Sequence, residues 1–425
     1  MTDARNRSGA VTSPLSFNAR QVGYSDMDGR GDALQLCGQK RDGRYYLYVG
    51  HFWSGGLSVL DVTNPAAPEV IHHLPGPTLN TWHINLQVAG DLLMVANERF
   101  IPGWGTVPPE SPFEAGVRFF DVSDPSAPRR LGAWHTSGPG THRNWYAGGR
   151  YAYLSASEEG YAGRFLVILD VSDPELPHEA GRWWVPGQAM KLGEKPWWPT
   201  DRASAHLYSF HGCVVAGDLA YLGYQDLGFK ILDVADPARP ELVGELSTHP
   251  PFGGFTHTAL PLPERRLVVV AEETIAYNCQ EEQKRIWLVD AREPSRPASF
   301  ATLPLPEELP GQPRWSEKGG RFGPHNLHEN RSGAFQSETV LFNAFFNAGL
   351  RVYDIRDPFR PREVAWFIPP DPERMHDPRP NAPKTISSQD VYVDDRGYCF
   401  ITDYNAGLYV VELTGEARRL LGLSG

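Results

Sequence analysis

The sequence of 425 residues has little of what would place a chain in a membrane, on a secretory route or on nucleic acid. No run of about 18 apolar residues is present, so we expect no segment that spans a membrane. The opening residues, MTDARNRSGAVTSP, hold no apolar stretch of the kind that a secretory signal needs. The formal net charge of −11 argues against nucleic acid or an anionic membrane surface as the main partner.

Cysteine is also scarce, and its spacing suggests neither a disulfide framework nor a metal site. The chain has four cysteines and no C-x-x-C pair: Cys37, Cys213, Cys279 and Cys399. Free thiols are the ordinary state in a reducing compartment, so we expect a cytoplasmic protein.

What the sequence does contain is a repeat, and helical periodicity is absent. Six segments share an apolar run, an Asp-Val or similar pair, and a proline turn: 57–68 (LSVLDVTNPAAP), 117–128, 166–177, 229–240, 286–297 and 350–361. A shortened copy, LYVVEL at 408–413, closes the chain. The copies recur roughly every 40 to 60 residues, a spacing typical of propeller blades.

Each unit holds four short strand-like runs separated by Gly, Pro, Asp and Asn. A unit of this size cannot cover both faces of its own sheet, whereas sheets arranged radially cover one another. The seven copies therefore predict an all-β fold, a seven-bladed β-propeller of four-stranded antiparallel blades.

The predicted domain organisation is simple. Residues 1–16 are polar and predicted to form a disordered N-terminal tail, and residues 17–425 a single propeller domain. Two segments are candidates for the strand that closes the ring: 19–24 near the N-terminus and 416–421 near the C-terminus. The sequence leaves both open.

Long insertions break the repeat at five places: 99–115, 186–208, 274–285, 304–326 and 369–387. In an up-and-down blade, the loop after the second strand and the loop between blades lie at the same end. We therefore expect all five on one face of the disc, where long loops usually serve binding.

Polar residues recur at the start of each unit, where the innermost strand would line the central channel. In blade order they are Gln35, His83, His142, His211, His257, His328 and Gln389. A second set falls at the end of the second strand: His51, Glu98, Glu158, Gln225, Glu273 and Asp403. Because the two strands are antiparallel, both sets should meet at the long-loop face.

A ring of imidazoles backed by carboxylates has the composition of a metal site, since a ligating His usually donates its other N–H to a carboxylate. Imidazole suits transition metals rather than Mg or Ca. We therefore predict a divalent transition metal (Fe, Zn or Mn). Its predicted ligands are His83, His142, His211, His257 and His328.

Other residues receive predicted roles around this centre. Glu98, Glu158 and Glu273 would orient the ligands, and one of them would move a proton. Trp197 and Trp198 are candidates for a lid over an apolar substrate, and Arg143 for binding a substrate carboxylate. Each also has an ordinary structural interpretation, as loop packing or a surface ion pair.

The repeated LVILDVSDP core resembles the LVIVD repeat proteins, over most of the chain from about residue 23 to 413. The resemblance implies a propeller fold but no settled reaction, and no catalytic residue is carried over from it. A looser similarity of plan, not of sequence, links the His ring to carotenoid-cleaving oxygenases, propellers whose iron is held by four axial His backed by Glu.

The sequence therefore favours a metal-dependent enzyme, of hydrolase or lyase type, that acts on a small organic molecule. Two alternatives stay open. One is a non-catalytic propeller that binds a protein partner through its loop face, with an inert His ring or one that orders channel water. The other is a non-haem iron oxygenase with an all-His site.

Overall fold

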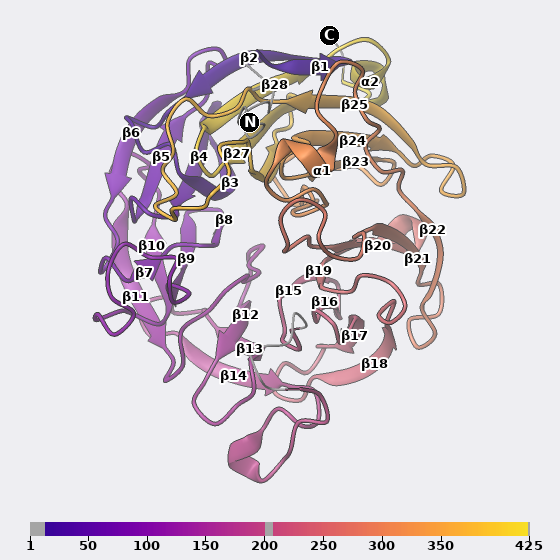
Figure 1. Ribbon diagram of the computed structural model, residues 1–425. Helices are drawn as coiled ribbons and strands as arrows, with labels where there is room; N and C mark the ends of the chain where they lie inside the picture. The colour runs from indigo at the N-terminus through magenta and orange to yellow at the C-terminus, as the bar shows by residue number, and fades with distance from the viewer. Residues whose placement is uncertain (1–12, 200–206, 424–425) are drawn as a thin grey trace, which may run out of the picture.

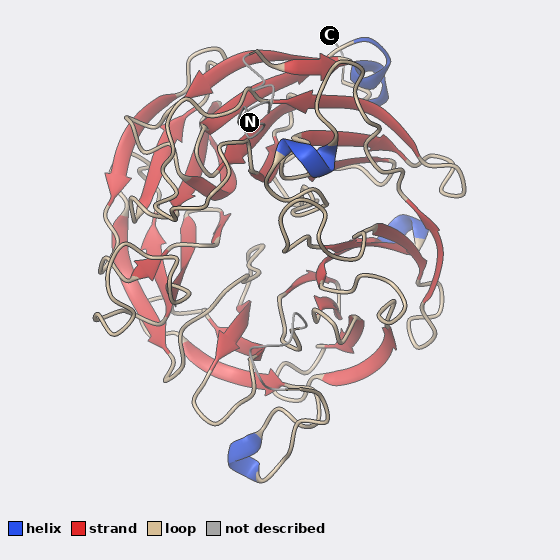
Figure 2. Cartoon of the chain, viewed as in Figure 1, coloured by secondary structure: helices blue, strands red, loops and turns tan. Residues whose placement is uncertain are grey.

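The computed structural model describes residues 13–199 and 207–423, and it shows seven antiparallel sheets set radially around one axis (Figure 1). The predicted seven-bladed propeller is therefore confirmed. Within the described residues, helix is limited to short segments on loops and at the edge of the disc (Figure 2): η1 (Met190–Leu192), η2 (Pro263–Arg265), α1 (Trp315–Lys318) and α2 (Gly415–Leu420).

The first three blades follow the order of the chain. Blade one comprises β3 (Ala33–Arg41), β4 (Arg44–His51), β5 (Leu57–Asp61) and β6 (Glu69–Leu74). Blade two comprises β7 (Thr81–Trp82), β8 (Leu86–Ala89), β9 (Leu92–Arg99), β10 (Gly116–Asp121) and β11 (Arg129–His135). Blade three comprises β12 (Tyr151–Ser157), β13 (Arg164–Asp170) and β14 (His178–Trp183), and residues 141–145 join it by single bridges in place of an inner strand.

The remaining blades complete the ring. Blade four comprises β15 (Gly212–Ala216), β16 (Leu219–Gly223), β17 (Phe229–Asp233) and β18 (Glu241–Leu246). Blade five comprises β19 (Thr256–Leu262), β20 (Leu267–Glu272), β21 (Ile286–Asp290) and β22 (Ala298–Thr302). Blade six comprises β23 (Val340–Ala344), β24 (Leu350–Asp354) and β25 (Arg362–Ile368), and blade seven β26 (Ser388–Val393), β27 (Tyr398–Asp403) and β28 (Gly407–Leu413).

The N-terminal residues close the ring. β2 (Ala19–Ser25) pairs with β28 as the outer strand of blade seven, and β1 (Leu15–Phe17) pairs with β25 of blade six. Of the two candidate closing strands, the N-terminal one is thus correct, and residues 415–420 form α2 instead. The predicted tail boundary after residue 16 falls inside β1, and residues 1–12 lie outside the described residues.

The hydrophobic core lies between blades rather than inside any one of them. Seven clusters of buried apolar residues each join two neighbouring blades, including one that joins blade seven to blade one. The third strands, such as β5 and β24, are buried along their whole length, whereas the outer β6 has no buried residue. This explains the continuous apolar runs of the repeat, because a strand covered on both faces needs no alternation.

The acidic residues of the repeat build its turn. Asp233 accepts a hydrogen bond from the backbone N–H of Ala235, and Asp236 accepts one from Ala238. The backbone N–H of Arg239 donates to the carbonyl of Asp236 and completes the turn. Asp and Asn side chains favour this local pairing, and proline cannot continue a strand. The Asp-Val-x-Asp-Pro pattern is therefore turn chemistry rather than a binding motif.

Each such turn also packs against the outer strand of the preceding blade. Gly244 in β18 faces the proline turn of blade five so closely that a Cβ would overlap the carbonyl oxygen of Pro294. Gly181 in β14 faces Pro237 of blade four in the same way. Glycine at this place in the outer strand lets two blades approach through their backbones.

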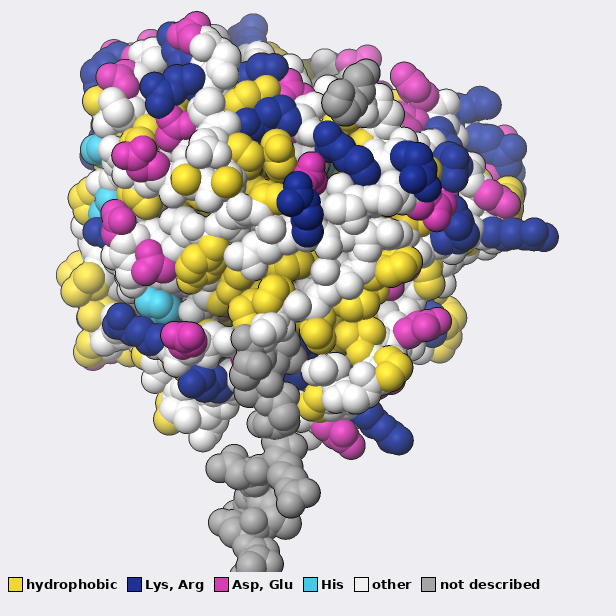
Figure 3. All heavy atoms as spheres, turned by 90° about the horizontal axis from the view of Figure 1, so that it is seen from above, with side chains coloured by type: hydrophobic (Ala, Val, Ile, Leu, Met, Phe, Trp, Pro, Cys, Tyr) yellow, Lys and Arg dark blue, Asp and Glu magenta, His cyan; other side chains and the backbone are white. Residues whose placement is uncertain are grey.

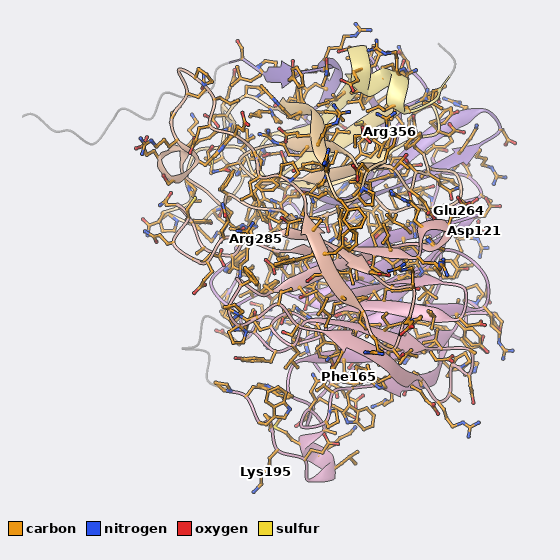
Figure 4. The ribbon with its side chains drawn as sticks, turned by 90° about the vertical axis from the view of Figure 1, so that its right-hand side faces the viewer. Asp121, Phe165, Lys195, Glu264, Arg285 and Arg356 are labelled. Carbon is orange, nitrogen blue, oxygen red and sulfur yellow. The ribbon has the colours of Figure 1, made fainter. Side chains whose placement is uncertain are left out.

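The two faces of the disc differ. Seen from the side, Arg285, at the end of a long loop of blade five, lies at the face opposite to the short turns that carry Glu264 and Asp121 (Figure 4). Figure 3 shows the rim of the disc rather than either face, and there basic and acidic side chains are interspersed with exposed apolar ones. Among the described residues, no helix has the length and apolar character needed to cross a bilayer.

Replacing Gly244 by alanine tests the contact between blades. We expect Gly244→Ala to lower the free energy of unfolding by about 2 kcal/mol, the cost of forcing atoms into a packed site. Glu241→Ala, on an exposed position of the same strand, should change it by less than about 0.5 kcal/mol. Urea denaturation of both variants measures the difference, and equal stabilities would contradict the packing role of Gly244.

Truncation tests ring closure. A chain without residues 1–25 lacks β1 and β2, whereas a chain without residues 1–12 keeps both. We expect the shorter chain to melt at least about 5 °C below the longer one, since a loss of 1 kcal/mol shifts the melting temperature by roughly 2–4 °C in larger domains. Coinciding melting curves would show that the N-terminal strands do not close the ring.

Candidate metal centre

A cavity of about 400 Å³ opens at the long-loop end of the axis. Every one of the five long insertions contributes to its lining, through Ile101 and Trp104, Leu207, Ile275 and Tyr277, Arg321 and His325, and Arg379. The loops and the inner strands therefore enclose one site, as the positions of the insertions predicted.

Four imidazoles from four successive blades lie side by side on one wall of this cavity. They are His142 of blade three, His211 of blade four, His257 of blade five and His325 of blade six. Neighbouring ring centroids are 4.8 Å apart for His142 and His211, 4.0 Å for His211 and His257, and 4.7 Å for His257 and His325.

The backbone sets where these rings lie. The N–H of His211 donates to the carbonyl of Gly223 at the end of β16, and the N–H of His325 donates in the same way to Ala344 at the end of β23. His142 pairs likewise with Ser155. Each ring therefore begins its blade at the mouth of the channel.

Hydrogen bonds to Nδ1 orient three of the four rings. Nδ1 of His142 lies 2.6 Å from the carboxylate of Glu98, and Nδ1 of His325 lies 2.6 Å from the carbonyl oxygen of Gln389. Nδ1 of His257 lies 2.7 Å from the hydroxyl of Thr258. A carboxylate or carbonyl can only accept, so His142 and His325 carry the proton on Nδ1 and keep a lone pair on Nε2.

Glu273 lies close to three of the four rings. Its carboxylate oxygens are 3.7 Å from Nε2 of His257, 3.7 Å from Nε2 of His325 and 3.9 Å from Nε2 of His211. Arg321 donates to the same carboxylate at 3.0 Å. Donor atoms of His211, His257 and Glu273 lie within 4.8 Å of one another, which brings them within reach of a single ion.

Burial determines the charge of this group. It lowers the pKa of His211, His257 and His325 well below the ordinary value, and neighbouring cationic groups lower it further. The rings are therefore neutral near pH 7, the form that binds metals. Burial raises the pKa of Glu273 to about 7, against the opposing effect of Arg321.

Glu98 behaves differently. Burial alone would raise its pKa, but the His142 ring and the Arg164 guanidinium, 3.2 Å away, together hold it below the ordinary value. Glu98 is thus an ionised partner that fixes the His142 ring, which is the arrangement expected behind a metal-binding histidine.

Blades seven, one and two form the opposite wall, which is apolar. It is lined by Leu34, Trp82, Ile84 and Tyr404, part of an aromatic cluster built around the buried Phe52. The Phe52 ring lies 4.5 Å from Trp82 and 5.1 Å from Tyr404. The site therefore has an imidazole half and an aromatic half.

The structure places His83 outside this cavity. Its neighbours Trp82 and Ile84 line the wall instead, and the His83 ring lies on the other side of the inner strand, towards Gly76. Successive side chains of a strand point to opposite faces, so the offset of one residue seen in the sequence is enough to turn His83 away.

His328 also lies outside, in a separate pocket deeper in the channel. Its Nε2 lies 2.8 Å from the carbonyl of Phe335, and its Nδ1 accepts from the N–H of Val393. His325, three residues earlier, takes the place that the sequence assigned to His328. No constant spacing identifies His325, because it lies 24 residues before Gly349, whereas His211 lies 17 residues before the matching Gly228.

The other predicted residues are dispersed. Glu158 pairs with Lys191 and Arg182 at the surface of blade three. Trp197 is 71% exposed, and Trp198 packs on Tyr208, both away from the cavity.

Arg143 lies deeper in the channel, beside His328. It donates to Asn326 at 2.6 Å and to Glu329 at 2.9 Å. Of the remaining second set, Gln225 lines the cavity, whereas His51 contacts Ser58 and Asp403 accepts from the backbone of Ser387.

Comparisons with known proteins support the fold. The family model for the LVIVD repeat matches residues 45–73, 143–184 and 211–248, so the chain carries the repeats that its sequence resembled. No curated protein matches the sequence.

Solved structures agree. A hypothetical selenium-binding protein from Sulfolobus tokodaii has a TM-score of 0.53 at 13% identity, over 87% of this chain and 91% of that one. The N-terminal domain of Nup159 has a TM-score of 0.51 at 10% identity, over 96% and 97%. A functionally unknown protein from Desulfotomaculum acetoxidans has a TM-score of 0.50 at 11% identity, over 80% and 90%. Identities this low show a shared fold alone.

Glu98 and Glu158, for which the sequence predicted the same role, should differ in how much each contributes to the free energy of unfolding. Glu98→Ala leaves His142 and Arg164 without their buried carboxylate, and we expect it to lower the free energy of unfolding by about 3 kcal/mol. Glu158→Ala removes a more exposed pair and should cost about 1 kcal/mol or less. Urea denaturation of the metal-free protein measures both, and equal costs would contradict the buried role of Glu98.

Proposed function

We propose that this LVIVD-repeat propeller binds a divalent transition metal at the His-lined end of its axis and acts there on a small organic substrate. The observation that carries the proposal is the convergence of imidazoles from four blades, three of them close to the buried carboxylate of Glu273.

The residues fit such an ion. Nε2 of His257 is buried without a hydrogen-bond partner among the described residues, and so is Nδ1 of His211. An unpaired buried polar atom costs roughly 1–3 kcal/mol, which coordination would remove. His142 and His325 keep a lone pair on Nε2, since a carboxylate and a carbonyl occupy their Nδ1 atoms.

The donor set favours a transition metal. Imidazole nitrogen suits Fe, Zn, Cu or Ni, and a single carboxylate is compatible with each. Fe, Zn and Mn remain the metals that we propose. The proposed ligands are His211, His257 and His325, with His142 as a fourth. Glu273 would either bind the metal as well or act beside it as a proton-transfer group.

The chemistry supplied by such a metal is Lewis-acid activation of a carbonyl group or of water, and hydrolysis or a lyase reaction needs no more. The protein residues would do the rest. Arg321 holds Glu273 at 3.0 Å, so this carboxylate is positioned to take or return a proton at the face of the imidazole cluster. Glu98 accepts a hydrogen bond from Nδ1 of His142 and so fixes the orientation of that ring.

Metal analysis of untagged protein tests the proposal. We expect about one equivalent of a transition metal. The double variant His211→Ala, His257→Ala should lose it, and so should His325→Ala. His328→Asn is the matched control, because His328 lies three residues from His325 but in a different pocket, and it should keep the metal.

A second measurement separates a catalytic site from a structural one. Cobalt-substituted protein should change its visible spectrum when azide is added, because a catalytic site keeps a position that exchanges its ligand. Folded protein that binds no metal would overturn the metal centre. A metal-loaded protein whose spectrum ignores azide would instead support a non-catalytic propeller.

A further inference from the structure

We propose that the substrate is a flat aromatic or conjugated carboxylate, held by Arg379 through its anionic end and by the aromatic wall through its apolar body. The inference rests on the proposed function, because part of the case for an anionic substrate is the positive charge of the proposed metal. Its structural basis lies in the half of the cavity without histidines.

Arg379 is held in place from two sides. Its guanidinium carbon lies 3.9 Å from the ring centroid of Trp104, and its Nε lies 2.9 Å from Oδ1 of Asp377. Nη2 donates to Oδ2 of the same carboxylate at 2.5 Å. Asp377 is buried, and its backbone N–H donates to Asn405 at 2.9 Å, which ties this loop to blade seven.

This arrangement leaves one edge of the guanidinium free. Asp377 occupies the edge formed by Nε and Nη2, and no acceptor among the described residues takes a hydrogen bond from Nη1. The edge formed by Nη1 and Nη2 is therefore available on a side chain that lines the cavity. A carboxylate fits such an edge with two parallel hydrogen bonds, because both groups are planar.

The charges of the cavity point to an anion. Three arginines line it, and each faces a carboxylate: Arg164 with Glu98, Arg321 with Glu273, and Arg379 with Asp377. With all three carboxylates ionised, these side chains balance one another in charge. A divalent ion adds two positive charges, and a substrate carboxylate would offset one of them.

The apolar wall selects the body of the substrate. Trp82, Ile84 and Tyr404 come from blades two and seven, opposite the histidines of blades three to six (Figure 1). Trp82 is fixed by its contact with Phe52, so the wall is preformed rather than assembled on binding. A volume of about 400 Å³ is near the lower end of the range of roughly 300–1,000 Å³ for small-molecule pockets, which suits a compact ring system.

Calorimetric titration with matched ligands tests the inference. The probes are trans-cinnamate and its neutral isostere cinnamamide, and 2-naphthoate and 2-naphthamide. We expect each acid to bind at least about tenfold more tightly than its amide, because a bidentate, charge-assisted pair is lost in the amide. Arg379→Gln should abolish this preference, and Arg379→Lys, which keeps the charge but not the fork, should retain only part of it.

Arg374→Gln is the control, since Arg374 is an exposed residue of the same loop outside this cavity. It should keep the preference of the parent protein. Acids that bind no better than amides, acids that do not bind at all, or a preference that survives in Arg379→Gln would each overturn the inference.

Metal content, measured in the same preparations, separates this inference from the proposed function. Arg379→Gln should keep its metal while losing the preference for the acid, because Arg379 is not among the proposed ligands. Protein that binds no metal but still prefers acids through Arg379 would refute the metal centre and leave the carboxylate site standing.

Discussion

The contact between neighbouring blades is the constraint on which the rest of the structure depends. No blade has a core of its own, because the buried apolar clusters lie between blades and the ring is complete only when blade seven meets blade one. Glycines such as Gly244 bring the backbones close enough for the next turn to set the angle between sheets. That angle, repeated around the ring, is what carries the ends of the inner strands to one axis. Residues far apart in sequence are therefore brought together by the geometry of the ring, and no local sequence pattern links them.

The same constraint holds an unfavourable local structure in place at the mouth of the channel. Gln225, Phe255 and Phe346 have φ values of 46°, 55° and 36°, which residues with side chains seldom adopt. Single bridges between blades hold them there, as where Gln225 pairs with Thr256 of the next blade and Phe346 with Ser388. The Phe346 ring in turn lies 4.6 Å from His325. Strained backbone of this kind persists only where its surroundings over-determine it, and such places are often functional sites.

The repeat made the fold predictable, whereas the site required a register that the repeat does not encode. Blade number, strand order and the loop face follow from turn residues that recur with the period, so each copy supports the others. A ligand depends on single positions. His83 lies one position away from the register of the other histidines, and a shift of one position turns a side chain to the other face of a strand. The sequence pointed to His328 because the segment before β23 is longer in blade six, so the histidine that lines the cavity, His325, lies further from that strand than the histidines of the other blades lie from theirs. The aromatic wall gave no signal, since Trp82 and Tyr404 resemble any other core residue until the ring is assembled.

The division of the cavity into two halves bears on why the imidazoles are there. Histidines that only bridged strands would satisfy both ring nitrogens, as His328 does between Phe335 and Val393. Those of the cavity do not, because Nε2 of His257, 3.7 Å from Glu273, and Nδ1 of His211 are left without a hydrogen-bond partner among the described residues. Other buried imidazoles in the described chain also have an unpaired atom, such as His83, but they do not share a carboxylate within coordinating reach. The free energy lost at the unpaired Nε2 of His257 is recovered by a group that this atom can bind, and an ion held together with His211 and Glu273 would be such a group.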